Sequence, residues 1–157
     1  MLKKIVFFLV TISILSGSSL FTGMSLEKLK SFKYEDQFEK EIKIPKSVRL
    51  VILSYEKGTG ATVNELLNEQ SPTYLEDHNT LFIADISGMP SLITSMFALP
   101  KMQKYKHTIY LNYTERFAKA FPPKEEKITL LHFNAQNFLS KITYISKKEE
   151  LQEAIEL

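Results

Sequence analysis

Apolar and polar positions along the chain predict three buried strands. Residues 48–53 read Val-Arg-Leu-Val-Ile-Leu, an apolar run broken once, which is typical of a central strand covered on both faces. Leu81–Ala84 predicts a second buried strand. His107–Tyr113 predicts a third, in which the alternation places Ile109 and Leu111 on one face. These three segments are expected to form the middle of one sheet.

Helices are predicted between these strands. Thr62 precedes Glu65 by three positions, the spacing of a capping box, and predicts a helix from Val63 to Leu75. Pro90 suits the first position of a second helix, and an apolar stripe follows it. Glu115–Phe121 predicts a short third helix before two prolines. Strands and helices therefore alternate, as they do in α/β folds.

The two ends of the domain follow other patterns. Lys127–Phe133 and Phe138–Ile145 predict a β-hairpin around an asparagine-rich turn. Ser146 and Glu149 have the spacing of another capping box and predict a terminal helix. Residues 24–46 are charged with scattered apolar positions and predict a lead-in strand or loose hairpin.

The first residues have the pattern of an export signal. Lys3 and Lys4 precede the apolar run 5–15, and small polar residues follow it. This order predicts a signal peptide over residues 1–23, cleaved within 18–23, and a periplasmic protein. The apolar run is shorter than the roughly 20 residues that a transmembrane helix needs. The alternative is an uncleaved segment that anchors the domain to the inner membrane.

Composition narrows the function. The 157 residues allow one domain, for which we predict residues 47–157. Removing Lys3 and Lys4 from 20 basic residues leaves 18, equal to the 18 acidic residues, so nucleic-acid binding is disfavoured. The chain contains no cysteine, which excludes thiol chemistry and lipid attachment through a lipobox cysteine.

From residue 46 to residue 157 the order of elements resembles the thioredoxin-like superfamily. The similarity is closer to its exported reductase and peroxiredoxin branch, which inserts a strand and a helix before the final hairpin. The resemblance implies a three-layer α/β/α fold with a central mixed sheet and a C-terminal β-hairpin plus helix. It also implies a site where the first central strand meets its helix, because the helix start lowers the pKa of a thiol there.

The residues at that junction depart from the family. Thr59 and Thr62 have the spacing of the family's paired cysteines, so both sulfur positions carry hydroxyls. A threonine hydroxyl is a far poorer nucleophile than a thiolate, and no histidine lies nearby in sequence to activate it. The family's cis-proline would fall at Pro122 or Pro123, but four residues, 124–127, separate them from the next apolar run. The resemblance therefore implies the scaffold without the redox activity.

The same junction is a candidate ligand site. Two glycines at a helix start can present backbone amides to an anion. The segment lacks the third glycine of a dinucleotide-binding motif and the lysine-serine ending of a phosphate-binding loop. The alternative is a plain turn with a hydroxyl cap. Asp85 ends a central strand, a favoured site position in α/β sheets, or caps the helix at Pro90. The candidate ligand-binding residues are Lys57, Gly58, Thr59, Gly60, Thr62, Asp85, Pro122 and Pro123.

Other reactive or adaptable residues suggest structural roles. His78, His107 and His132 are far apart in sequence, and none has metal-ligand spacing, so no metal site is predicted. The segment 86–102 is rich in methionine and also contains Phe97. At helical spacing such a stripe is expected to fill the core, and the alternative is an adaptable partner-binding surface. Exposure decides between them.

Three functions remain open. The first is a periplasmic binding or accessory module that takes an unknown protein or small molecule without thiol redox activity. The second is an enzyme or accessory of a redox system with flavin or nucleotide near Gly58–Thr62, although no cofactor motif is present and none is predicted. The third is an envelope structural protein, in contact with the membrane only through an uncleaved signal. No catalytic constellation is recognisable.

Overall fold

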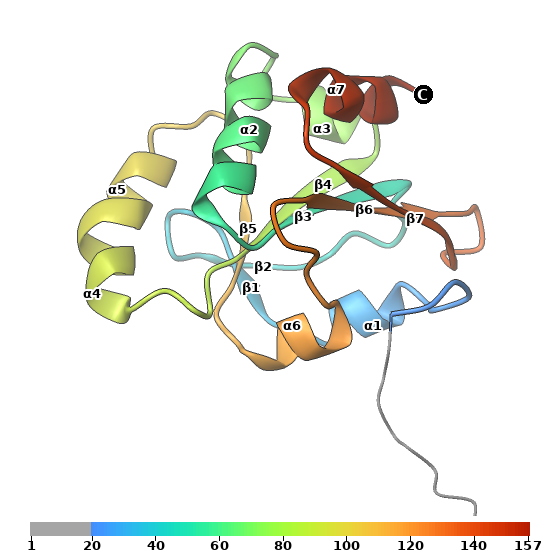
Figure 1. Cartoon of the computed structure of the whole chain (residues 1–157), viewed down its shortest axis with the longest axis horizontal. Helices are drawn as coiled ribbons and strands as arrows, with labels where there is room; N and C mark the ends of the chain where they lie inside the picture. Colours follow the sequence, from blue (N-terminus) through green and yellow to red (C-terminus); the bar gives the residue numbers. More distant parts are fainter. Residues whose placement is uncertain (1–19) are drawn as a thin grey trace, which may run out of the picture.

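In a computed structural model, which describes residues 20–157, the protein is built on one seven-stranded mixed sheet. Its strand order is β2-β1-β5-β4-β3-β6-β7 (Figure 1). β3, β4 and β5 run parallel, and the remaining pairs are antiparallel. The strands are β1 (Tyr34–Glu35), β2 (Glu41–Ile42), β3 (Leu50–Ser54), β4 (Thr80–Asp85), β5 (Tyr110–Asn112), β6 (Ile128–Phe133) and β7 (Leu139–Ile145). The predicted export signal falls mainly on residues 1–19, outside the described residues.

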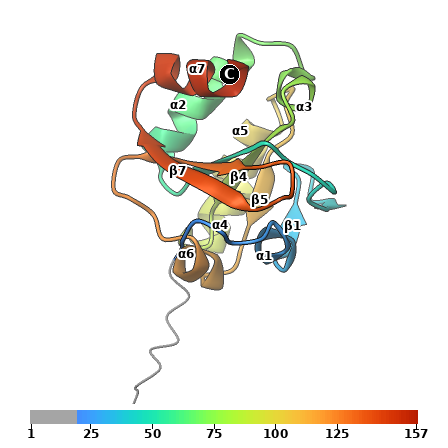
Figure 2. The ribbon, with the colours of Figure 1, turned by 90° about the vertical axis from the view of Figure 1, so that its right-hand side faces the viewer.

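Helices cover both faces of the sheet and confirm the predicted α/β class. α2 (Lys57–Asn68), α3 (Tyr74–Asp77) and α7 (Lys148–Glu156) lie on one face, while α1 (Glu27–Lys30) and α6 (Arg116–Ala120) lie on the other (Figures 1 and 2). The segment α4 (Ser91–Ile93), the π-helical turn η1 (Thr94–Ala98) and α5 (Leu99–Met102) form a continuous helical stretch beside α2 (Figure 1).

The predicted central strands are confirmed, and their alternation divides the core in two. Leu50 and Ile52 of β3 pack into the cluster under α2, α3 and α7. Val51 and Leu53 pack into the cluster above α1 and α6. All four side chains are fully buried. Because successive residues of a strand face opposite sides, a continuous apolar run fits a strand with helices on both faces.

The first helix begins earlier than its predicted capping box. α2 starts at Lys57 rather than Val63, and it ends at Asn68, after which α3 forms a separate short helix. Thr62 lies inside the second turn, where its hydroxyl donates to the Gly58 carbonyl at 3.2 Å. The hydroxyl cap is supplied instead by Thr59, which contacts the backbone of Glu56. Gly58 and Gly60 lower the helix propensity of the first turns. For this reason the sequence predicts a helix that begins only at Val63.

The terminal helix is also displaced by one residue from its predicted box. The Glu150 carboxylate, rather than that of Glu149, accepts from the backbone amides of Lys147 at 3.0 Å and Ser146 at 3.2 Å. At the other end of α7, the Arg49 guanidinium donates to the carbonyls of Ala154 and Ile155. A cation that binds the last carbonyls satisfies acceptors without an intrahelical partner. Arg49, at the start of β3, therefore joins the terminal helix to the central strand.

The helical stretch after β4 differs most from expectation. Pro90 precedes the first helical residue instead of occupying that position. The stretch buries only Thr94 and Leu99. Met102 packs against the core, whereas four of the other large apolar side chains point outward, with exposed fractions of 64% for Leu92, 43% for Ile93, 59% for Met96 and 63% for Phe97. The expectation that this stripe fills the core is therefore wrong for these residues.

Candidate functional site

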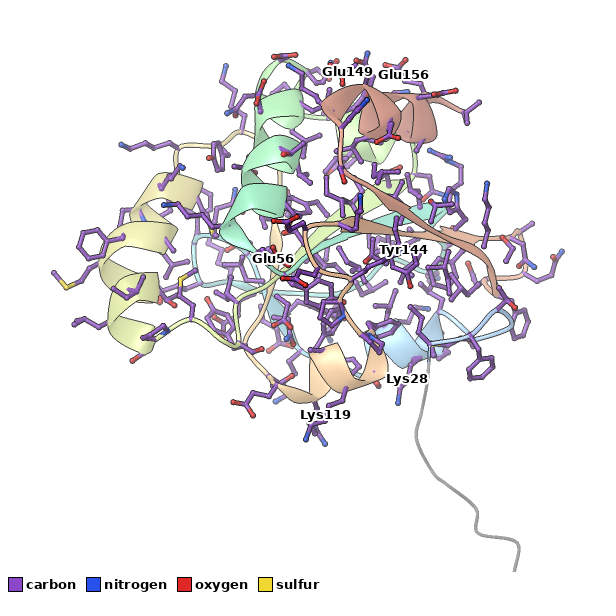
Figure 3. The ribbon with its side chains drawn as sticks, viewed as in Figure 1. Lys28, Glu56, Lys119, Tyr144, Glu149 and Glu156 are labelled. Atoms are coloured by element: carbon purple, nitrogen blue, oxygen red, sulfur yellow. The ribbon has the colours of Figure 1, made fainter. Side chains whose placement is uncertain are left out.

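The start of α2 uses its hydroxyls locally. The Thr59 hydroxyl donates to the Glu56 carbonyl at 3.0 Å and accepts from the Glu56 amide at 3.4 Å. Glu56, at the start of α2 in Figure 3, accepts from the Glu126 amide at 3.1 Å through its carboxylate. The hydroxyls of Thr59 and Thr62 contact only backbone groups. Neither has the basic neighbour that nucleophilic activation of a threonine requires.

A cavity of about 360 Å³ opens between α2, the ends of the central strands and the stretch α4–η1–α5. Phe82, Ala84 and Ile109 form its floor on the sheet side. Ile93 and Phe97 belong to its outer wall. The volume lies within the range of about 300–1,000 Å³ typical of small-molecule sites, which are mostly apolar with a few polar groups.

Several polar groups converge on this apolar cavity. Ser54, Asn64 and Asp85 line it and are themselves buried. Lys57 and Lys101 line it as exposed residues from opposite walls, and Glu56 also lines it. Ser54 and Asp85 lie at the carboxyl ends of the parallel strands β3 and β4, where open α/β sheets bind ligands. The arrangement suits a molecule with an apolar body and a polar or anionic end.

Only part of the predicted candidate set meets at the cavity. Lys57, Gly60 and Asp85 line it. Gly58, Thr59 and Thr62 belong to the same helix but are not among its lining residues. Pro122 and Pro123 are exposed after α6, and no cis peptide bond occurs within residues 20–157. Ligand binding by the candidate set remains a prediction.

Asp85 joins the ends of two neighbouring strands. Its carboxylate accepts from the Ser87 amide at 3.0 Å and from the Asn112 side-chain amide at 2.9 Å. The Asn112 amide group also donates to the Thr114 carbonyl, and its oxygen accepts from the Thr114 hydroxyl. Asp85 therefore fixes the loops that follow β4 and β5. The alternative role, capping the helix after Pro90, is wrong, because no side chain caps that helix.

A buried histidine lies behind the cavity wall. The Asn64 amide donates to the Gly60 carbonyl at 2.8 Å, so its oxygen faces His107 Nε2, also at 2.8 Å. Nε2 therefore carries the proton and Nδ1 is an acceptor. Nδ1 is buried and has no hydrogen-bond partner within the described residues. Because protonation would bury a charge there, desolvation lowers the pKa of His107 to about 4.

The surroundings of His107 make it part of the cavity's support. Its ring stacks on Tyr105, with 5.3 Å between centroids and 17° between planes. Both Tyr105 and Asn64 line the cavity. The Gln37 side chain donates to the His107 carbonyl and accepts from the Ile109 amide. Sequence reasoning missed Asn64 and Gln37, because these bonds join residues that lie far apart in the chain.

The two other histidines have local hydrogen-bond partners. Residues 20–157 contain no cluster of three or more potential metal ligands. His78 Nδ1 is 2.8 Å from the Tyr74 carbonyl, and His132 Nε2 is 2.9 Å from the Thr143 hydroxyl. Each imidazole therefore has a local structural partner.

Comparisons with known proteins identify the fold. No protein-family description and no curated protein matches the sequence. Among solved structures, the bacterioferritin comigratory protein of Xanthomonas campestris is 8% identical, with 85% of this chain and 95% of that chain covered and a TM-score of 0.56. A secreted disulfide oxidoreductase of Mycobacterium tuberculosis is 12% identical, covering 84% and 98%, with a TM-score of 0.51.

A third similar structure belongs to a protein that is itself described as thioredoxin-like. An uncharacterised thioredoxin-like protein from Porphyromonas gingivalis is 10% identical, covers 80% of this chain and 87% of that chain, and has a TM-score of 0.50. At such identities the likeness concerns the fold alone. The chain has the thioredoxin-like fold and contains no cysteine.

Proposed function

We propose that the protein is an exported binding module that takes a small, largely apolar ligand in the cavity beside α2 and has no thiol redox activity. The observation that carries this proposal is the cavity itself, with its apolar floor and the buried polar side chains of Ser54, Asn64 and Asp85. Apolar pockets with a few convergent polar groups are where small molecules usually bind. The exposed Lys57 and Lys101 favour an anionic end on the ligand.

Export rests on the sequence pattern of residues 1–23. The secretion of one protein with a similar fold supports it. Within residues 20–157 no helix has the length and apolar character to cross a bilayer. We therefore propose the periplasm as the location of the domain, with an uncleaved inner-membrane anchor as the alternative. The mass of the protein recovered from cells distinguishes the two.

Native mass spectrometry of the protein recovered from its own cells tests the binding function. We expect a bound small molecule that denaturation releases, because the cavity is large enough to hold one. An absorbance spectrum of the same sample identifies a flavin if one is bound. Protein that carries no small molecule, and binds neither an anionic apolar probe nor any member of a panel of amphipathic acids, contradicts the proposal.

A matched pair of substitutions tests the cavity directly. Ala84→Leu extends a floor residue into free volume, whereas Ala120→Leu extends a buried residue of the opposite core. Overpacking costs about 1–3 kcal/mol, so we expect that loss for Ala120→Leu and less than about 1 kcal/mol for Ala84→Leu. Urea denaturation measures both.

The same pair separates ligand binding from stability. The fluorescent probe 1-anilinonaphthalene-8-sulfonate has an apolar body and an anionic group, which match the cavity floor and its lysines. We expect Ala84→Leu to weaken probe binding at least tenfold, a loss of about 1.4 kcal/mol. Ala120→Leu is expected to bind as the unchanged protein does. Equal binding by both variants would place the probe elsewhere.

Redox assays test the second half of the proposal. We expect no turnover in insulin reduction with dithiothreitol and none in peroxide consumption, because the chain contains no thiol. A thiol-containing reductase, assayed in parallel, shows that the assay works. Turnover that follows this protein through purification and disappears when it is removed would end the proposal.

A further inference from the structure

The helical stretch after β4 presents apolar side chains to solvent on its outer side. Leu92, Ile93, Met96 and Phe97, here called the apolar ridge, have exposed fractions of 64%, 43%, 59% and 63%. A surface helix normally turns its apolar stripe toward the core. Side chains of this stretch project away from the body in Figure 3. A contiguous exposed apolar patch of this kind marks an interaction site.

The chain segment that carries the apolar ridge has charges of one sign. Between Asp85 and Glu115 the sequence contains no aspartate or glutamate, but it contains Lys101, Lys104 and Lys106. All three lysines are exposed, and none forms an ion pair within residues 20–157. The basic and acidic residues of the chain nearly balance, so this acid-free segment is a local basic surface.

We propose that the apolar ridge and Lys101, Lys104 and Lys106 form a contact surface for an anionic lipid bilayer. An amphipathic helix at a membrane interface buries its apolar side chains at the level of the headgroups, while its lysines bind anionic lipids. Here both features lie on one short stretch of chain. The long lysine side chains can reach the headgroups while their stems follow the apolar surface.

The lysines also argue against a second copy of the chain as the occupant. A symmetric contact through the apolar ridge places the same surface on both sides. It would therefore bring the lysine groups of the two copies together, and like charges at an interface disfavour association. Lipid phosphates supply the opposite charge. Glu56 is an acidic residue across the cavity from the apolar ridge, and its carboxylate accepts a hydrogen bond from the Glu126 amide.

The position of the surface adds a consequence for the cavity. Ile93 and Phe97 of the apolar ridge and the neighbouring Lys101 also line the cavity. Contact with a bilayer would therefore place the cavity beside the lipid, where apolar molecules are concentrated. The membrane contact and the binding of a ligand in the cavity are separate proposals, and either can be correct without the other. The membrane contact is also separate from any anchoring by the N-terminal segment.

A single tryptophan tests the contact, because the chain has none of its own. Phe97→Trp places the reporter on the apolar ridge, and Phe38→Trp places a control on another exposed phenylalanine. The full chain carries each substitution, so any binding through the N-terminal segment is common to both. Vesicles are made of phosphatidylcholine, with or without phosphatidylglycerol, and brominated lipids serve as quenchers.

We expect phosphatidylglycerol vesicles to shift the emission of Trp at position 97 to shorter wavelength, and brominated lipids to quench it. The control at position 38 is expected to change little. Replacing Lys101, Lys104 and Lys106 with glutamine is expected to weaken the effect at least tenfold. The same replacement at the exposed Lys33, Lys40 and Lys43, which alters net charge equally, is expected to leave it within twofold.

Three results would overturn the proposal. In the first, protein bound to phosphatidylglycerol vesicles shows no shift and no quenching at position 97. In the second, the shift at position 97 arises with increasing protein concentration and no lipid, which makes a second copy the occupant. In the third, phosphatidylcholine alone produces the full effect and the lysine replacements change nothing, which removes the role of charge.

Discussion

Replacing Phe117 with alanine is expected to lower the free energy of unfolding by about 3–5 kcal/mol. Phe117 is fully buried on the α6 side of the sheet. Its ring lies 5.2 Å from Phe32, 5.0 Å from Phe121 and 6.3 Å from both Tyr34 and Tyr55, measured between centroids. Truncation removes the buried ring and all four aromatic contacts, and leaves a cavity that the sheet cannot close. Urea denaturation measures the loss.

Phe138→Ala is the matched control for this substitution. Phe138 has an exposed fraction of 45% and precedes β7. We expect a loss below about 1 kcal/mol, since a surface side chain leaves no enclosed cavity. If the two variants lose similar stability, the aromatic cluster around Phe117 is not the centre of the core on the α1 and α6 side of the sheet.

Acidification is expected to destabilise the protein through His107. In the unfolded chain this imidazole has a pKa of 6.5, and in the folded protein desolvation lowers the pKa to about 4. Between these values the unfolded state binds a proton that the folded state does not, so stability falls as pH decreases from about 6.5 to about 4. By this linkage the loss at pH 5, relative to pH 8, is about 2 kcal/mol. Thermal or urea unfolding at both pH values measures it.

His107→Gln tests the origin of the acid sensitivity. Glutamine has an amide that can donate to Asn64, but it does not titrate. We expect the loss between pH 8 and pH 5 to shrink to the share contributed by the other groups with a lowered pKa. These are His132, whose pKa is lowered by burial and by Lys141 and Arg49, and the hydrogen-bonded carboxyls of Glu150 and Glu156. An unchanged pH dependence in the variant would show that His107 is not the responsible group.

Sequence patterns predicted the layers of this protein because apolar periodicity reports burial directly. The run 48–53 required helices on both faces, and β3 has them. Alternation placed Ile109 and Leu111 on one face of their strand, and both side chains pack into the core under α2, α3 and α7. Element order then led to the thioredoxin-like fold, which solved structures share. When a whole strand is buried, its run of apolar residues can be recognised in a single sequence.

The candidate site could be predicted only in part, for two physical reasons. Local propensity misplaced the start of α2, because Gly58 and Gly60 favour a turn when tertiary packing is ignored. Methionine and phenylalanine at helical spacing indicate an apolar stripe but not which way it faces, and the side chains of Met96 and Phe97 face solvent. The cavity lies between α2 and the stretch α4–η1–α5. Its lining residues come from separate parts of the chain, so no single segment of the sequence predicts it.

The hydrogen bonds of the central strand bear on when the protein can fold during synthesis. β3 pairs with β6, from Leu50 opposite His132 to Leu53 opposite Thr129, and Arg49 donates to carbonyls at the end of α7. A nascent chain can complete the first set of contacts only after residue 132 has left the ribosome, and the second only after residue 155 has. If the protein is exported, this late closure leaves the sheet incomplete while a translocation channel accepts the polypeptide. The order of the strands would then serve secretion as well as the native state.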